Sequence, residues 1–217
     1  MYLPQHFEES RVDVMHALIR AHPLATLVTL TTSGLVANHI PLLLAAGPTL
    51  NGSLQGHVAR ANPLWREFDK NLGVLAIFQG PDSYISPTWY ATKKETGKVV
   101  PTWNYAVVHA HGTLRIVDEA NWVRAQIEAL TTQNEAALAN PWSVADAPHD
   151  YTEKLIAAVV GIEIQITRLA GKWKVSQNQP RKNQASVIDA LRNLGNDSSL
   201  AMAALVEAHT QASRQSE

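Results

Sequence analysis

The first part of the chain carries the hydrophobic pattern of one helix followed by a series of strands. After Ser10, apolar residues recur at helical spacing up to His22-Pro23, where the helix should end because a residue before proline avoids the α region. Alternating and continuous apolar runs then predict strands, separated by turns such as Thr31-Thr32-Ser33-Gly34. The strands expected here are residues 24–30, 35–44, 49–58, 72–78 and 83–86, with a turn at 79–82 before the last.

The second part of the chain mixes strands with helices. Residues 92–98 are polar and predict an exposed loop, and a strand follows at 99–112. The other elements expected are helices at 118–139 (N-cap Asp118), 151–160, 186–194 and 198–212, and a hairpin of strands 161–169 and 172–177. About seven strands joined mainly by hairpins favour a mostly antiparallel barrel over a parallel sheet.

The strand at 99–112 carries more hydrogen-bonding chemistry than an ordinary half-buried strand. Alternation along the strand assigns its side chains to two faces. One face holds Thr102, Asn104, Ala106, Val108 and Ala110, and the other holds Trp103, Tyr105, Val107, His109 and His111. Uncharged polar groups beside aromatic rings suit a planar ligand with polar edges. A core strand with amphipathic rims explains the same pattern equally well.

Composition bounds the class of protein. The 217 residues are 46% apolar and suit one large globular domain, or one domain with a small appendage. A net charge of −1 provides no overall field for nucleic acid or an anionic membrane. The absence of cysteine excludes disulfides, thiolate metal sites and cysteine nucleophiles. Because the sequence shows no signal-peptide pattern and no apolar run long enough to span a membrane, we expect a cytoplasmic protein without a membrane partner.

Common catalytic and nucleotide motifs are missing. The sequence contains no GxSxG elbow, no GxGxxG and no GxxxxGK[ST]. His109 and His111 could ligate zinc or iron, but no third ligand lies at a telling spacing. The residues themselves therefore assign no catalytic group and no metal site.

Residues 56–65 combine a strand end with the start of a short helix. His57 and Arg60 lie just before Asn62, the predicted helix cap, and Pro63. Arginine offers a bidentate fork for phosphate, and a helix start adds backbone donors. The segment therefore indicates a phosphate site. A pair between Arg60 and a nearby carboxylate such as Glu67 is the equal alternative.

Three further segments carry candidate chemistry. Residues 36–41 contain Asn38 and His39, and a backbone-bonded histidine is the more common situation for a residue such as His39. Residues 83–90 are rich in hydroxyls and aromatic rings, which could equally form a half-exposed rim. Lysines at 172 and 174 could meet an anion or face water.

The C-terminal part is the best candidate for contact with DNA. Residues 168–192 hold six basic side chains and one acidic one, which could neutralise phosphates. Two short helices around Gly195, a plausible helix stop, loosely resemble a helix-turn-helix. The second helix is rich in alanine and poor in base-reading side chains, so a solvated or dimer-packing segment is favoured. Arg181 and Lys182 are the candidate DNA contacts.

Several segments together resemble one family, the FMN-binding negative transcriptional regulators of the PaiB type. They occur in register over nearly the whole chain to about residue 195, whereas 196–217 has no match. The matching segments are MYLPQHFEE, ANHIPLLL, GHVARANPLW, FQGPDSYISPTWY, ETGKVVPTWNYAVVHAHG, the DAPHDY–VGIEI stretch and GKWKVSQNQ.

The resemblance implies a mainly β fold, an FMN-binding split β-barrel of the pyridoxamine phosphate oxidase type, with peripheral helices. We expect this barrel at 1–177 and a basic helical tail at 178–217. The fold is usually a homodimer with FMN near the subunit interface. Arg60 is implied as the phosphate ligand. The other residues implied at the cofactor are His57, Asn62, Ser86, Trp89, Thr102, Trp103, Asn104, Lys174 and Gln177.

The leading functional hypothesis is therefore a homodimeric FMN-binding repressor that contacts promoter DNA. One departure from the family pattern is Gln179-Pro180 before Arg181, which puts a role for that arginine in doubt. The alternative is a small flavin-dependent oxidoreductase or oxidase, or a haem-handling relative, on the same barrel. Its acid–base or haem-ligand candidates are His39, His57, His109 and His111. A third hypothesis is a ligand-sensing dimer with neither activity.

Overall fold

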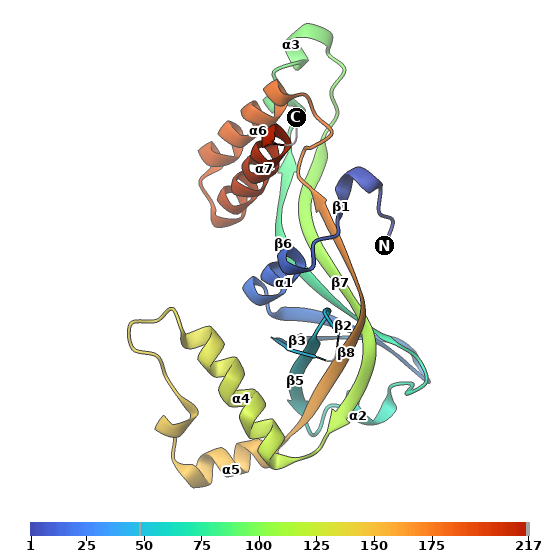
Figure 1. The fold of residues 1–217 in the computed structure, drawn as a ribbon, viewed down its shortest axis with the longest axis vertical. Coiled ribbons are helices and arrows are strands. Elements are labelled where there is room, and N and C mark those ends of the chain that lie inside the picture. The colour runs from blue at the N-terminus through green and yellow to red at the C-terminus, as the bar shows by residue number, and fades with distance from the viewer. Residues whose placement is uncertain (48, 216–217) are drawn as a thin grey trace. The chain divides into compact units, whose positions relative to one another are not determined.

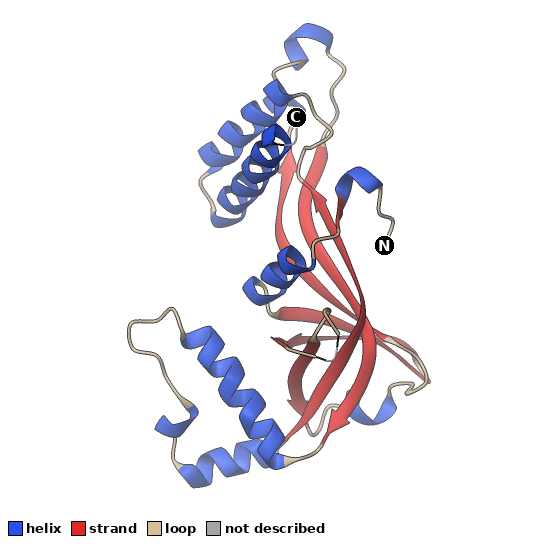
Figure 2. Cartoon of the chain, in the orientation of Figure 1, coloured by secondary structure: helices blue, strands red, loops and turns tan. Residues whose placement is uncertain are grey.

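The computed structural model describes residues 1–47 and 49–215 (Figure 1). Its strands join in one sheet of order β3-β2-β6-β7-β8-β5-β4, with β1 pairing β8 (Figure 2). The strands are β1 Glu8–Glu9, β2 Leu24–Thr31, β3 Gly34–Pro41, β4 Leu43–Ala45, β5 Ser53–Ala59, β6 Val74–Ile85, β7 Thr102–Val117 and β8 Val159–Lys174. The helices are α1 Val12–Ala21, α2 Leu64–Glu67, α3 Lys93–Thr96, α4 Ala120–Glu135, α5 His149–Ala157, α6 Arg181–Leu194 and α7 Asp197–Gln215, with 3-10 turns η1 Gln5–Phe7, η2 Pro87–Trp89 and η3 Val144–Asp146.

The chain divides into two compact units, and β6, β7 and β8 contribute residues to both. One unit comprises residues 12–78 and 109–169, and the other comprises 1–11, 79–108 and 170–217. The division expected from the sequence, at 177/178, stays a prediction. Among the described residues, no helix has the length and apolar character needed to cross a bilayer.

The unit of residues 12–78 and 109–169 is organised around antiparallel strands. The hairpin β2–β3 turns at Thr32-Ser33, as predicted, and Gly34 has φ 112°, a conformation that glycine adopts without strain. Strand β5 pairs antiparallel with β8, from Ser53 opposite Gln165 to Ala59 opposite Val159. Helices α4 and α5 belong to the same unit, with η3 between them (Figure 1).

The unit of residues 1–11, 79–108 and 170–217 has its own core. Helices α6 and α7 lie side by side (Figure 1) and pack their apolar faces around Leu191 and Met202, which are fully buried. Gly195 lies in the left-handed region with φ 69° and ends α6, as predicted. The C-terminal helices are therefore part of a packed core.

Several predicted turns and boundaries are wrong: helix α3 lies inside the exposed loop predicted at 92–98, and three further errors have a clear physical reason. The turn predicted at 79–82 lies inside β6, where the Ser198 hydroxyl donates to the Asp82 carbonyl at 2.7 Å. The turn predicted at Ala170-Gly171 lies inside β8, because Gly171 pairs with Glu9 of β1. The single strand predicted at 35–44 is divided into β3 and β4, because the intervening Leu42 N–H donates to the Pro23 carbonyl at 2.9 Å.

Candidate functional site

A groove of about 500 Å³ lies beside the edge strand β3 in the unit of residues 12–78 and 109–169. Its walls are mostly short apolar side chains and neutral hydrogen-bonding groups, and Glu67 is the one charged residue that lines it. Thr29 and Thr31 come from β2, Val36 and Asn38 from β3, and Ala61 and Asn62 from the segment after β5. A volume in this range accommodates a cofactor-sized molecule. We call it the β3 groove.

One buried hydroxyl of the β3 groove has no hydrogen-bond partner in the part of the chain that the structure describes. The inward positions of β2 are Ala25, Leu27, Thr29 and Thr31. The Thr31 hydroxyl donates to the Gly34 carbonyl at 3.1 Å. The Thr29 hydroxyl, on a side chain only 1% exposed, makes no hydrogen bond within the described residues. Because an unsatisfied buried polar atom is costly, a rotation of the Thr29 side chain that brings its hydroxyl to a ligand atom in the groove would be stabilising.

Two amides fix the opposite wall of the β3 groove. The Asn62 Nδ2 group donates to Asn38 Oδ1 at 3.0 Å, and Asn62 Oδ1 accepts from the Leu64 N–H at 2.9 Å. Asn62 thus binds the first residue of α2, but the predicted cap is displaced by one residue, because Pro63 is the N-cap and the helix begins at Leu64. Both amides are held in one orientation, which suits recognition of a ligand with polar edges.

The Arg60 side chain is held by four hydrogen bonds. Its Nε donates to the Ala157 carbonyl at 2.9 Å, and Nη2 donates to the Val159 carbonyl at 3.1 Å. The guanidinium also makes a two-pronged pair with Asp118, at 2.9 and 2.6 Å. The carboxylate partner is thus Asp118, 58 residues away, and not Glu67 as the alternative proposed.

The Arg60–Asp118 pair changes both groups and the start of α4. Hydrogen bonding to Asp118 raises the pKa of Arg60, and hydrogen bonding to Arg60 lowers the pKa of the Asp118 carboxyl. Asp118 was expected to cap the following helix. That prediction is wrong, because its carboxylate is occupied by Arg60 and α4 begins after Glu119 without a side-chain cap.

His57 does not line the β3 groove. Its ring lines a separate pocket beneath α4 and α5, and its Nδ1 lies 2.8 Å from Gln126 Oε1. Of the cofactor candidates His57, Arg60 and Asn62, only Asn62 lines the β3 groove. Arg60 does not line it, but its neighbour in the chain, Ala59, does.

The remaining cofactor candidates belong to the other unit, and several of them contact one another. Lys174 Nζ donates to the Thr102 hydroxyl, and Asn104 Nδ2 donates to the Ser176 hydroxyl at 2.9 Å. Asn104 is 1% exposed and its Oδ1 lacks a partner in the described structure. Gln177 donates to the Trp173 carbonyl at 2.5 Å. Ser176 has φ 64°, an uncommon conformation for a non-glycine residue.

The predicted alternation of β7 is confirmed except at Val107, which is buried although it belongs to the opposite face. Asn104, Ala106, Val108 and Ala110 are buried, whereas Trp103 on the other face is 54% exposed. Trp103 is therefore not on the same side as Thr102 and Asn104. The Ser86 hydroxyl accepts from the Thr88 N–H at the start of η2, and Trp89 packs against the core of its own unit.

The pair His109 and His111 lies with ring centroids 6.4 Å apart. Burial lowers the pKa of both imidazoles, and the charge of Arg168 lowers them further. The described residues contain no group of three or more side chains placed to hold a metal ion. We therefore expect both imidazoles to be uncharged at neutral pH.

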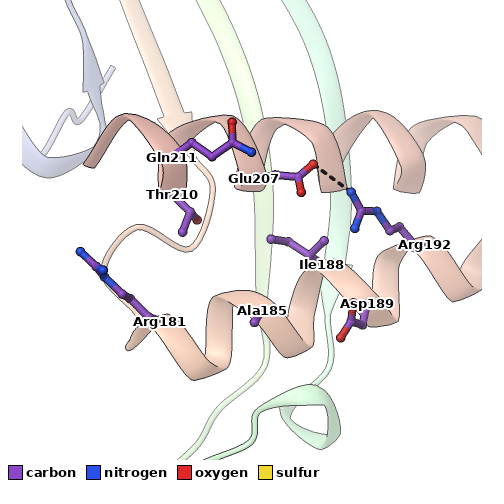
Figure 3. Close-up of a pocket in the computed structure, with 8 residues that line it drawn as sticks. All are labelled: Arg181, Ala185, Ile188, Asp189, Arg192, Glu207, Thr210 and Gln211. Carbon is purple, nitrogen blue, oxygen red and sulfur yellow. Dashed lines mark hydrogen bonds and ion pairs between the residues drawn. The ribbon is translucent and has the colours of Figure 1, made fainter. Parts of the chain in front are cut away.

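The two candidate DNA contacts begin α6. Lys182 Nζ lies 2.5 Å from a Glu95 carboxylate oxygen, so its charge is paired. Arg181 lines a pocket of about 230 Å³ between α6 and α7, together with Asp189 (Figure 3). In the same pocket Arg192 pairs with Glu207 at 2.8 Å. Acidic partners thus reduce the positive charge that the sequence concentrates in this segment.

Sequence reasoning missed the groove residues on β2. Thr29 and Thr31 occupy inward positions of an alternating strand, where a hydroxyl is unexpected. That exception to the hydrophobic pattern was the available signal. The Arg60–Asp118 pair and the His57–Gln126 contact had no local signal, because their partners are 58 and 69 residues apart.

Comparisons with known proteins identify relatives over most of the chain. Residues 1–168 match the family described as "Putative FMN-binding domain". An uncharacterised protein of Emericella nidulans is 36% identical, covering 95% of this chain and 96% of its own. Protease synthase and sporulation protein PAI 2 of Bacillus subtilis is 29% identical, covering 95% and 97%. These alignments extend into 196–217, for which the sequence analysis found no match.

Solved structures show the same fold. The flavocytochrome Anf3 from Azotobacter vinelandii superimposes with a TM-score of 0.55 at 11% identity, covering 79% of this chain and 72% of that one. The predicted split β-barrel of the pyridoxamine phosphate oxidase type, with C-terminal helices, is confirmed. At this identity the likeness concerns the fold alone.

Proposed function

The chain belongs to the family of putative FMN-binding domains and is homologous to PAI 2 (PaiB) of Bacillus subtilis, and we propose that it binds FMN. The ring system of the FMN would lie in the β3 groove. The observation that carries the proposal is the unpartnered, buried Thr29 hydroxyl in a groove of about 500 Å³. Val36, Ala61 and the fixed amides of Asn38 and Asn62 supply apolar contact and polar edges. Bound FMN would supply electron-transfer chemistry, and the protein would orient it.

The phosphate group of FMN is assigned to Arg60. Two backbone carbonyls hold the guanidinium in place without neutralising it, and Asp118 is the one carboxylate paired with it in the described structure. Both side chains are substantially exposed, and exposed ion pairs contribute only about 0–1 kcal/mol. A phosphate dianion can therefore compete with Asp118 for the same fork.

The protein is proposed to act as a homodimer through β3. This strand ends the sheet order, and its Leu35 side chain is 77% exposed. Exposed apolar edge strands are normally covered or protected. Because Val36 and Asn38 of β3 also line the groove, a partner on this edge would border the bound flavin. Leu35→Lys should convert the dimer to a monomer in sedimentation experiments, and an unchanged mass would refute this interface.

The physiological role is proposed to be repression of transcription, as in regulators of the PaiB type. Direct contact with DNA through Arg181 and Lys182 would require opening the exposed Lys182–Glu95 pair, which costs little. The test is fluorescence anisotropy with a duplex from the gene's own promoter at 50 and 200 mM salt. Neutralising Arg181 and Lys182 should reduce both binding and its salt dependence, whereas Lys93→Ala/Lys94→Ala, on exposed α3, should not.

The test of FMN binding is a titration of the flavin-free protein monitored by flavin fluorescence. Ala61→Phe should abolish saturable FMN binding, because the added phenyl ring would fill the β3 groove. Ala145→Phe, at an exposed position in η3, is the matched control. Equal FMN affinity of both variants would show that the flavin does not bind in the β3 groove. No saturable binding by the unaltered protein would refute the proposal altogether.

The same sample separates regulation from catalysis. Rapid bleaching of the bound flavin by NADH or NADPH, together with no promoter binding at low salt, would favour the flavin-dependent oxidoreductase instead. Promoter binding without such bleaching would favour the repressor.

A further inference from the structure

A second pocket, of about 430 Å³, lies in the unit of residues 12–78 and 109–169. We call it the α4–α5 pocket. Its apolar walls come from α4, the segment around η3 and α5, and include Ile127, Trp142, Val144, Tyr151, Leu155 and Ile156. The ends of β5 and β8 complete the pocket with His57 and Val159. Aliphatic and aromatic walls with few polar groups are typical of small-molecule sites.

The polar groups at the α4–α5 pocket are few and specific. Gln126, 2% exposed, accepts from His57 through Oε1 at 2.8 Å. An amide oxygen only accepts, so this contact places a proton on His57 Nδ1 and leaves Nε2 of the neutral ring as an acceptor. The Thr152 hydroxyl is already used, because it donates to the Pro148 carbonyl at 3.2 Å. Beside the Tyr151 hydroxyl and the Trp142 indole N–H, His57 is thus the lining group whose free ring nitrogen can accept from a hydroxyl on an otherwise apolar ligand.

The Gln126 side chain is a second observation at the same place. Its Nε2 group is buried and has no partner among the described residues. A buried amide with half of its hydrogen bonds missing is costly in a protein that is selected only for stability. A glutamine at this position is explained if its amide oxygen holds the His57 imidazole in one tautomer, ready to bind a ligand.

We propose that the α4–α5 pocket binds a small aromatic molecule that carries one hydroxyl donor, with the ring among the apolar walls and the hydroxyl donating to His57. This site is distinct from the β3 groove and does not depend on flavin binding. Ala59 lines both cavities, so the two sites share one residue of wall. The size of the pocket admits a two-ring compound.

The test uses 2-naphthol and its ether 2-methoxynaphthalene, which has the same rings but cannot donate. Calorimetry on the flavin-free protein should give one 2-naphthol site per chain, bound about fivefold more tightly than the ether, as expected for one hydrogen bond of about 1 kcal/mol. His57→Phe should abolish the difference between the two compounds. Equal affinity of both compounds for the unaltered protein would overturn the role of His57.

Location is tested by filling the pocket. Ala147→Phe, at a half-buried lining position, should abolish 2-naphthol binding, whereas Ala145→Phe, two residues away and exposed, should not. Ala158→Phe, from another wall, is the second filling variant if Ala147→Phe unfolds the protein. Undiminished binding in both filling variants, or no binding by the unaltered protein, would refute the site. Loss of the dimer in these variants would instead make a second copy of the chain the occupant, which also overturns the proposal.

Discussion

Replacing Thr29 by valine should have opposite effects on the free protein and on its FMN complex. The Thr29 hydroxyl is buried without a partner among the described residues, and such a group costs about 1–3 kcal/mol of folding free energy. Valine keeps the shape and removes the polar atom. We therefore expect Thr29→Val to raise the unfolding free energy of the flavin-free protein by about 1–2 kcal/mol. If the hydroxyl binds the flavin, the same change should weaken FMN binding about fivefold.

Thr31→Val is the matched control, because Thr31 lines the same groove but its hydroxyl donates to Gly34. Losing that hydrogen bond, together with the contacts of the same hydroxyl with Ser33, should lower the unfolding free energy by about 1–2 kcal/mol. Urea titrations at one pH would show the two midpoints moving in opposite directions, each by roughly 0.5–1 M for a slope of about 2 kcal/mol/M. A Thr29→Val midpoint that falls with that of Thr31→Val would refute the reasoning. Unchanged FMN affinity would show that Thr29 does not touch the flavin.

Three further predictions follow from other contacts. Asp118→Asn should tighten the binding of FMN but not of riboflavin, because it frees the Arg60 fork for the phosphate; equal effects on both ligands, measured by fluorescence titration, would contradict the assignment. The protein should be less stable to urea at pH 5.5 than at pH 7.5, because burial lowers the pKa of His109 and His111, so the unfolded chain binds protons below about 6.5 that the folded one does not; a paired His109→Gln/His111→Gln variant should show a flatter pH dependence of stability, and an undiminished pH dependence would argue against this cause. Gly161→Ala should cost about 1–3 kcal/mol by thermal or urea unfolding, because the added Cβ would lie 2.5 Å from the Trp122 ring and 2.8 Å from the Val117 carbonyl, whereas Gly73→Ala, whose nearest contact is 3.3 Å, should cost less.

Local patterns in the sequence predicted the elements well where neighbours along the chain determine them. The helix after Ser10 ends before His22-Pro23, and the hairpin turn after Thr31 lies where the turn residues indicate. Predictions went wrong where a distant partner overrides local preference. Gly171 resembles a turn residue but is held in β8 by pairing with Glu9, which no pattern around residue 171 reveals.

The candidate site shows the same limit. The sequence drew attention to Arg60 because an arginine near a strand end suits an anion. Its carboxylate partner, Asp118, comes 58 residues later in the sequence, directly after β7, and no local pattern links the two. Asn62 was recognised because its hydrogen bond to the start of α2 is local, although Pro63 takes the capping position. The groove itself depends on β2, β3 and β5 meeting in space, which periodicity within each strand does not specify.

The course of β6, β7 and β8 also constrains how this protein can change over evolution. Each of the three strands supplies residues to both compact units, so neither unit corresponds to an uninterrupted stretch of the gene. A single recombination event cannot exchange one unit for that of a relative without cutting through a strand that serves the other. Residues 1–11, 79–108 and 170–217 must be inherited together for their unit to form. New specificity in this chain should therefore arise by point substitution in the groove and pocket walls, and not by the shuffling of modules.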